Sequence, residues 1–184
     1  MKKQEKLLGL MAEIQIKNFL DGEEAWFFPK HKESGVKGFL GTEKVAFVGK
    51  NPSFGHFPSD GNLFLYKELS RAGFKNAHIT DVIKRRLTNE EAKDIEKKKR
   101  ILSENLKWLR LEIDILGSVK IVAMGRDVQK MLKKYFSKDA VSDKWLHHYS
   151  WVEKYSEGKR KEKRKAFRKR LGEIKKEVLS FRRA

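Results

Sequence analysis

The chain has 184 residues, of which 39% are hydrophobic and 37% are charged, and it contains no cysteine. This length suits one domain with a substantial core, and the missing cysteines exclude disulfides, thiol nucleophiles and cysteine-ligated zinc or iron–sulfur clusters. The formal net charge is +18, from 43 Lys and Arg against 25 Asp and Glu. So large an imbalance favours a polyanionic partner, because basic side chains that neutralise phosphates release counterions. A Lys-rich thermophilic surface is the alternative.

The N-terminal segment combines basic and apolar side chains. Leu7, Met11 and Ile14 share one helical stripe, and Asp21 and Gly22 end it. Polar residues interrupt the apolar stretch, and no apolar run in the chain reaches the roughly 20 residues that a membrane span needs. We therefore expect a helix over residues 1–20 of a cytoplasmic, nucleoid-associated protein with no membrane partner.

Short apolar runs alternate with helical patterns through the middle of the chain. Strands are expected at 45–48, 77–83, 119–124 and 141–146, and helices at 63–72, 88–116 and 128–135. Thr88 and Glu91 form a capping box where the second of these helices begins. The alternation predicts an α/β fold: a single three-layer domain over 1–184, with a central, mainly parallel four-stranded sheet flanked by helices.

The C-terminal segment is the most basic part of the sequence, with 14 Lys and Arg but four Asp and Glu from Lys154 to Ala184. Apolar residues recur there at helical spacing, at Phe167, Leu171, Ile174, Val178 and Phe181. The spacing predicts a basic amphipathic helix over 158–184 that docks by its apolar side. Its other side, with Lys161, Arg164 and Arg168, suits a DNA backbone, although a solvated face would have the same composition.

Three segments are expected at the ligand-binding edge of the sheet, since ligands of parallel α/β sheets bind beyond the carboxyl ends of the strands. They are residues 49–54, 81–86 and 147–151. The first places Asn51 and Pro52 directly after the strand, without the Walker lysine or glycine spacing of a nucleotide-phosphate loop. A polar side chain at that position could equally belong to an ordinary turn.

These segments resemble, in the same order, the motifs of the uracil-DNA glycosylase superfamily. The resemblance rests on VAFVGKNPSFG at 45–55, HITDVIKRR at 78–86, VKIVAMGRDVQKML at 119–132 and HYSW at 148–151. The first contains the G-x-N-P form of the mismatch-specific branch, and the last stands where the family has H-P-S-P. The resemblance implies a monofunctional DNA glycosylase of base-excision repair, which flips a deaminated or otherwise damaged base out of DNA and hydrolyses its N-glycosidic bond. It implies uracil as the first candidate base, no metal or cofactor, damaged double- or single-stranded DNA as partner, and a monomer.

The resemblance also implies roles for residues that would contact the base. Asn51 would orient the attacking water, and His148 would donate to the leaving base as negative charge develops on it. The adjacent His147 could take that role instead. Phe64 would stack on the extruded base, unless it is a core residue. The base pocket would further include Gly49, Ser53 and Asp81.

A second group of residues would contact the DNA itself. Ser150 would bind a phosphate beside the lesion, and Trp151 or Val152 would fill the space that the flipped base leaves. The run of Lys84, Arg85 and Arg86 suits phosphate contacts, although each of these residues could also be an ordinary surface charge.

Two residues depart from the family pattern. Asp81 stands where the family reads uracil with asparagine, and Tyr149 replaces the first proline of H-P-S-P. Because an ionised aspartate only accepts hydrogen bonds, Asp81 is either protonated in a desolvated pocket or selects a base that presents a donor. The small Ser53, where the uracil-strict branch has tyrosine, implies a roomier pocket. The alternatives are a catalytically inactive nucleic-acid-binding protein on the same fold and a hydrolase of another nucleobase.

Overall fold

The computed structural model describes residues 2–52, 57–88, 90–91, 99–153 and 155–181. Its elements follow one another as α1 (Lys3–Leu20), the short 3-10 helix η1 (Gly38–Leu40), β1 (Val45–Gly49), α2 (Asp60–Arg71), β2 (His78–Asp81), α4 (Lys99–Leu116), β3 (Lys120–Ala123), α5 (Arg126–Tyr135), α6 (Tyr149–Glu153) and α7 (Glu157–Phe181). Ser53, a predicted pocket residue, lies outside the described residues. Within them, no helix is both long enough and apolar enough to cross a membrane.

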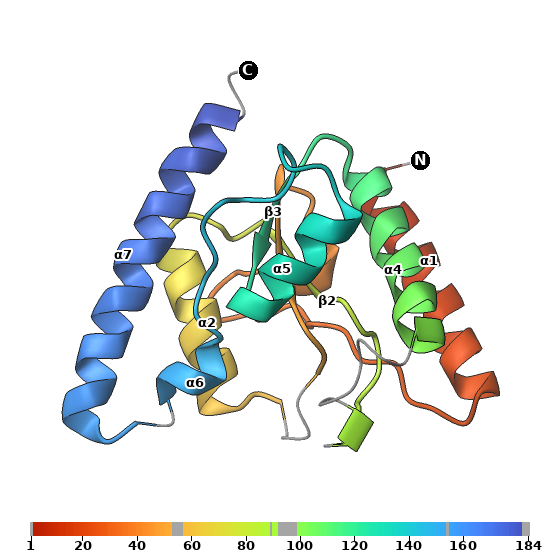
Figure 1. Ribbon diagram of the computed structural model, residues 1–184, viewed down its shortest axis with the longest axis horizontal. Coiled ribbons are helices and arrows are strands. Elements are labelled where there is room, and N and C mark those ends of the chain that lie inside the picture. The colour runs from red at the N-terminus through yellow and green to blue at the C-terminus, as the bar shows by residue number, and fades with distance from the viewer. Residues whose placement is uncertain (1, 53–56, 89, 92–98, 154, 182–184) are drawn as a thin grey trace.

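A parallel sheet in the order β2-β1-β3 forms the centre of the molecule (Figure 1). In its register, Gly49 pairs with Asp81 on one side of β1, and Val48 pairs with Ala123 on the other. Because the strands are parallel, their carboxyl ends meet at one edge, toward the bottom of Figure 1. The strand-end segments of the sequence analysis therefore start from a common edge.

The prediction of a fourth strand at 141–146 is wrong, because the described sheet has three strands. Val141 and Leu146 make isolated parallel bridges beside β3, to Ile121 and Met124. Between these bridges, Ser142 Oγ accepts a hydrogen bond from the backbone N–H of Lys144 at 3.1 Å. The backbone N–H of Lys144 thus bonds to a side chain within its own segment and not to β3, so the middle of the segment does not pair as a strand.

Helices cover both faces of the sheet (Figure 1). Val45 and Phe47 of β1 belong to a hydrophobic cluster that includes buried residues of α2, α6 and α7. Ala46 and Val48, which alternate with them, belong to a second cluster with residues of α1, α4 and α5. The α/β fold with a parallel sheet between helical layers is thus confirmed. That the whole chain forms one domain stays a prediction.

Two local sequence patterns are confirmed, one in α7 and one at Thr88 and Glu91. In α7, Phe167, Leu171, Ile174 and Val178 are buried, which fits the predicted apolar side of an amphipathic helix. The predicted capping box of Thr88 and Glu91 also forms, with Glu91 N donating to Thr88 Oγ1 at 3.1 Å and Thr88 N to Glu91 Oε2 at 3.0 Å. These reciprocal bonds satisfy backbone donors that a helix start leaves unpaired. In the expected helix over 88–116, the described helix α4 begins at Lys99.

Candidate active site

Gly49 and Asp81 lie side by side at the carboxyl edge of the sheet. The two residues are register partners, and a Cβ placed on Gly49 would overlap Asp81 Oδ1. It would also lie 3.4 Å from Met124 Cε, beyond the end of β3. Asp81 is 5% exposed, so its carboxyl group is enclosed in the space that the missing side chain of Gly49 leaves.

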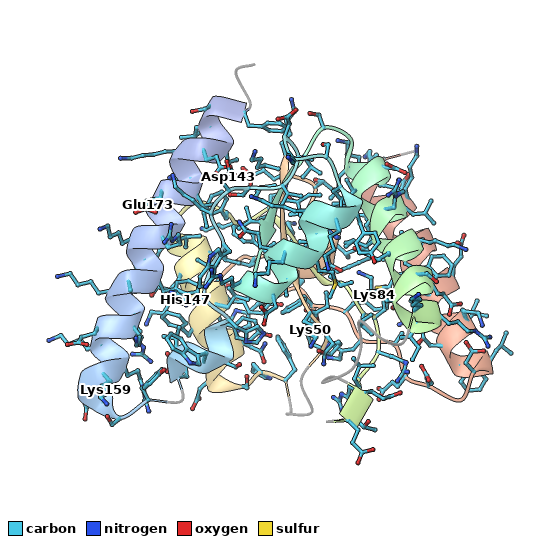
Figure 2. The ribbon with its side chains drawn as sticks, viewed as in Figure 1. Lys50, Lys84, Asp143, His147, Lys159 and Glu173 are labelled. Atoms are coloured by element: carbon cyan, nitrogen blue, oxygen red, sulfur yellow. The ribbon has the colours of Figure 1, made fainter. Side chains whose placement is uncertain are left out.

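Asn51 lies just beyond this pair. The pairing of the two chains continues past the strands, with Val82 N donating to Gly49 O at 2.9 Å and Ile83 N to Lys50 O at 3.0 Å. The half-buried Asn51 uses its Nδ2 to donate to the carbonyl of Pro52 at 3.0 Å. The third segment begins after Leu146, which bridges Met124 at the end of β3; Figure 2 labels Lys50, Lys84 and His147, one residue from each segment. The edge therefore gathers the three segments that the sequence singled out.

The environment of Asp81 acts on its protonation. Burial raises the pKa of the Asp81 carboxyl to about 7, against the lowering effect of Lys84, while Glu112 adds to the rise. A carboxyl with that pKa is divided between its acid and its ionised form near neutral pH. Both forms that the sequence left open are therefore accessible to this residue.

Tyr149 connects the histidine segment with Asp81. It is buried, and its hydroxyl accepts a hydrogen bond from Asn62 Nδ2 at 3.4 Å. Burial raises the pKa of the Tyr149 phenol, and the charge of Asp81 raises it further, so the two side chains are within electrostatic range. The ring of His148 stacks on Tyr149 at 4.4 Å between centroids. His148 Nδ1 and Ser150 Oγ share a hydrogen bond of 2.7 Å, which fixes the imidazole.

Phe64 has a different environment from that of a base-stacking ring. It is 6% exposed, and its ring lies 5.0 Å from Phe167 and 5.4 Å from the guanidinium of Arg164, both on α7. These partners belong to the α2–α7 interface, which is the core environment that the sequence analysis gave as the alternative. The role of Phe64 in base stacking does not fit this position.

Other aromatic rings extend from Tyr149. Phe28 lies 6.4 Å from Tyr149, Trp26 lies 4.7 Å from Phe28, and Phe57 lies 6.3 Å from Trp26, measured between centroids. Of these residues, Trp26 and Phe57 are half-buried. Sequence reasoning gave none of these three a role: Trp26 and Phe28 lie in residues 22–43, which have no strand or helix period, and Phe57 lies in the loop before α2. The cluster of aromatic residues in 22–43 was the available signal.

His147 and Trp151 form a second aromatic group. Their rings stack at 5.1 Å with an angle of 15°, and Lys163 Nζ lies 4.7 Å from the Trp151 ring. Burial lowers the pKa of His147, and the charges of Lys163 and Arg170 lower it further. Trp151 is 36% exposed, which suits a side chain that contacts DNA. His147 is packed against that exposed ring, whereas His148 is hydrogen-bonded beside Tyr149.

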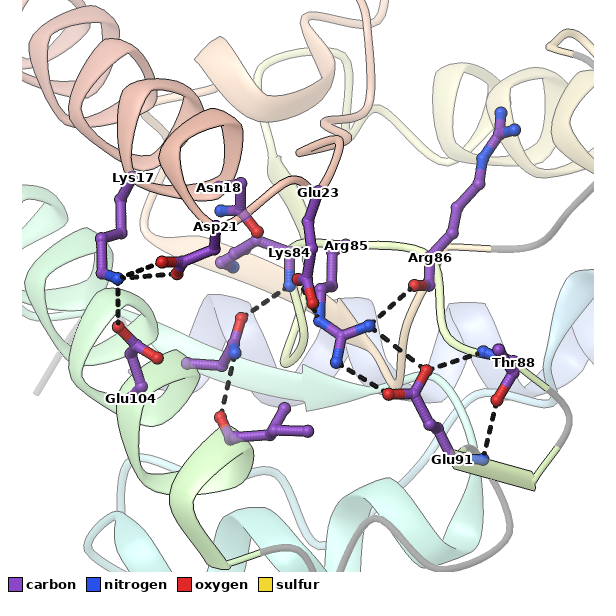
Figure 3. Close-up of polar contacts among 12 residues, drawn as sticks. Lys17, Asn18, Asp21, Glu23, Lys84, Arg85, Arg86, Thr88, Glu91 and Glu104 are labelled. Atoms are coloured by element: carbon purple, nitrogen blue, oxygen red, sulfur yellow. Dashed lines mark hydrogen bonds and ion pairs between the residues drawn. The ribbon is translucent and has the colours of Figure 1, made fainter.

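The three basic residues after β2 have unequal environments. Lys84 is 1% exposed, so the predicted contact with a phosphate does not fit its position. Arg85 is paired with Glu23 and with Glu91, the latter at 3.0 Å (Figure 3). Arg86 is half-exposed, and its side chain extends away from that cluster in Figure 3.

The basic residues predicted on α7 also differ from one another. Arg164 is paired with Glu153 at 2.6 Å and Arg168 with Glu68 at 2.9 Å, so these two side chains tie α7 to α6 and α2. Lys161 is exposed and lines a surface hollow of about 550 Å³ together with parts of both arginines. Among the three, Lys161 is the side chain best placed for a phosphate.

The sequence was compared with models of known protein families and with curated proteins. A sequence model of the uracil DNA glycosylase superfamily matches residues 38–172, which is well over half of the chain. The matched region contains β1, β2 and β3 and the segment from His147 to Trp151. No curated protein matches the chain. The matched region confirms the resemblance of the sequence motifs, and the chain belongs to the uracil DNA glycosylase superfamily.

Proposed function

We propose that the protein is a monofunctional DNA glycosylase that extrudes a damaged base and hydrolyses its N-glycosidic bond. The observation that carries the proposal is the enclosed carboxyl group of Asp81 over Gly49, at the edge of the sheet where Asn51 and Tyr149 also lie. An extruded base needs a group that can pair with its edge in a site shielded from water. Membership of the superfamily supports the same reaction.

His148 is the proposed donor to the departing base. If the hydroxyl of Ser150 donates to Nδ1 across their 2.7 Å contact, the ring proton is on Nε2. That N–H can stabilise the anionic leaving group, since charge develops on it in the transition state. Ser150 then positions the histidine, in place of the phosphate contact that the sequence suggested. Asn51 orients the attacking water, because its amide cannot remove a proton at neutral pH.

Asp81 is the proposed reader of the base. In its acid form the carboxyl can donate to a carbonyl oxygen such as uracil O4, and in its ionised form it accepts from an N–H group. With a pKa of about 7, the acid form is present at neutral pH. Uracil is therefore the first substrate to test, and its excision is expected to decline at higher pH.

The DNA contacts are proposed from exposed residues. Trp151, at 36% exposed, is the candidate for the space that the flipped base leaves. Lys161, Lys165 and Lys169 are exposed at successive turns of α7 and supply positive charge for phosphates. Phe57, half-buried beside Trp26 and Tyr66, replaces Phe64 as the candidate for stacking on the base.

The experiment is a panel of DNA duplexes and single strands incubated with the full chain and scored for abasic sites. Each oligonucleotide carries one uracil, hypoxanthine, xanthine, mismatched thymine or oxidised base, and His148→Ala protein is the control. The account expects release of at least one base by the wild type and strong loss in the variant. The absence of abasic sites across the panel contradicts it.

An inactive nucleic-acid-binding protein is the second candidate. The observation in its favour is the buried Tyr149 side chain beside Asp81, since a phenol at this edge occupies space that a base would need. In that case the chain binds the oligonucleotides of the panel, the salt dependence of binding is retained, and no base is released.

A further inference from the structure

Beneath Asp81 lies a buried polar chain that the reaction outlined above does not use. Lys84 Nζ lies 2.5 Å from the backbone oxygen of Asp81, 2.6 Å from Thr80 Oγ1 and 2.7 Å from Glu112 Oε1. Glu112 Oε2 lies 3.1 Å from His78 Nε2. Lys84 is 1% exposed, and Glu112 and His78 are fully buried. The ammonium of Lys84 is thus held directly next to the residue that carries the candidate base-reading carboxyl.

The contacts of His78 fix where one proton lies. Its Nδ1 is 2.6 Å from the carbonyl oxygen of Phe39, which can only accept, so Nδ1 carries a proton. The 3.1 Å contact of Nε2 with Glu112 then needs a second proton, located on one partner or the other. Burial works against ionisation of Glu112, but Lys84 and the contact with His78 lower the pKa of its carboxyl group below the usual value. Glu112 is therefore the ionised partner and faces Lys84 as an anion.

The charged and titratable groups around Asp81 come from few elements. Among the described residues, Lys84 follows it in the chain, and Glu112 on α4 and Tyr149 on α6 are within electrostatic range of it. Asp81 lies beside the uncharged Gly49 on β1, and the uncharged Met124 lies close to the same position from the end of β3. Lys84 and Glu112 act on the Asp81 carboxyl with opposite sign, since a cation favours the ionised form and an anion disfavours it.

We propose that the buried Lys84–Glu112 ion pair determines which edge of a base Asp81 accepts, by setting whether its carboxyl group carries a proton. Lys84 and Glu112 are thus positioning and specificity-determining residues, although neither contacts the base. The part of the inference that concerns base choice rests on the proposed function. The part that concerns the charge of Asp81 does not, and it can be measured in the protein alone.

Two substitutions should move the titration of Asp81 in opposite directions. Lys84→Met removes the cation and raises the pKa of the Asp81 carboxyl, whereas Glu112→Gln removes the anion and lowers it. In the double variant the shift is upward but smaller than for Lys84→Met, because Lys84 has the larger effect. Replacing both members of a buried ion pair often leaves a protein as stable as before, so the double variant keeps the test available if a single variant does not fold.

The experiment is an NMR titration of the full chain labelled with carboxyl-¹³C aspartate, with Asp81→Asn protein to assign the resonance. The expected shift of the Asp81 midpoint is about 1 pH unit or more upward for Lys84→Met, in the range that a neighbouring charge produces. Glu112→Gln is expected to shift it downward. Lys133→Met, which breaks the exposed pair with Asp143, is the matched control and should leave the midpoint unchanged. A general loosening of the fold would instead shift the Asp81 midpoint in the same direction in both variants.

The same proteins are then compared for uracil excision from a single-stranded oligonucleotide across pH. The proposal expects the falling limb of the rate to move with the NMR midpoint, upward for Lys84→Met and downward for Glu112→Gln. It is overturned if the Asp81 midpoint moves in neither variant, or in the same direction in both. It is also overturned if the variants excise uracil but the pH at which their rate falls does not follow the Asp81 midpoint. If the Asp81 midpoint shifts in opposite directions but the protein excises no base, the control of the Asp81 charge is supported. In that case only the proposed glycosylase function is contradicted.

Discussion

Asp81 Oδ1 occupies the volume that a Cβ on Gly49 would need, so one residue pair joins β1 and β2 at the edge of the sheet. The absence of a side chain at Gly49 leaves room for the carboxyl group of Asp81, which is the proposed base-reading group. This dependence can be measured as a coupling between the two residues, without any substrate.

Gly49→Ala is expected to lower the free energy of unfolding by about 1–3 kcal/mol, as overpacking does in a core. The cost should be distinctly smaller when Asp81 is also alanine, since the overlapping oxygen is then absent. Urea unfolding followed by tryptophan fluorescence measures both values. An equal cost of the Gly49 substitution in the two backgrounds contradicts the contact.

His148→Ala should reduce the rate of the chemical step by about 10²–10³-fold, the loss seen when one donor to a developing anion is removed. DNA affinity should change little, because this bond strengthens in the transition state. His147→Ala is the matched control, since that ring stacks on Trp151. Single-turnover kinetics on a substrate identified in the panel give the comparison. A larger loss for the His147 variant reverses the assignment.

Phe57 and Phe64 should respond in different ways to replacement by alanine. Phe64→Ala removes a ring from the α2–α7 interface and should cost about 3–5 kcal/mol of unfolding free energy. Phe57→Ala should cost less unfolding free energy than Phe64→Ala, because its ring is only half-buried against the core, and it should weaken binding of a base-containing strand by about 1–3 kcal/mol. Thermal unfolding and fluorescence anisotropy measure the two effects. If the Phe64 variant loses base binding but keeps its stability, Phe64 and not Phe57 stacks on the base.

The DNA-binding face can be tested with exposed lysines alone. Combined reversal of Lys161, Lys165 and Lys169 to glutamate should weaken duplex binding and reduce its salt slope, because fewer counterions are released. The control variant reverses three exposed lysines elsewhere, at Lys6, Lys44 and Lys107, with the same change in net charge. Arg164 and Arg168 are left intact, since their pairs with Glu153 and Glu68 hold α7 in place. Equal effects of the two triple variants would show that total charge alone matters.

The strands and the site edge could be predicted because the signals were local. Residues 45–48 are a continuous apolar run of the kind that a parallel strand buried on both faces requires, and Gly49 ends it. The parallel alternation then put Asn51 and Asp81 at one edge. The segment 141–146 is apolar only at its ends, because Ser142, Asp143 and Lys144 interrupt it. Ser142 Oγ accepts a hydrogen bond from Lys144 N there, and periodicity does not report such a bond.

Lys84 could not be placed from its neighbours in sequence, because three successive basic residues are typical of a surface. Its partner Glu112 gave a signal that went unused: it lies between Leu109 and Leu116 on the apolar side of α4. A carboxylate on a buried face needs a cation or a hydrogen-bond donor from elsewhere in the chain. The sequence pattern pointed to a buried partner, but tertiary packing alone identifies which residue it is.

The most direct test of the account is the rate of uracil excision as a function of pH, for the wild type and for Asp81→Asn protein under single-turnover conditions. The acid form of Asp81 is present below its pKa of about 7 and is lost as pH rises through that value. Asparagine has a donor at every pH. The account predicts a wild-type rate that falls above about pH 7, and a rate for the variant that stays level and is equal or higher. If the substitution changes neither the rate, nor its pH dependence, nor the choice among bases, Asp81 does not face the base and the central claim is contradicted.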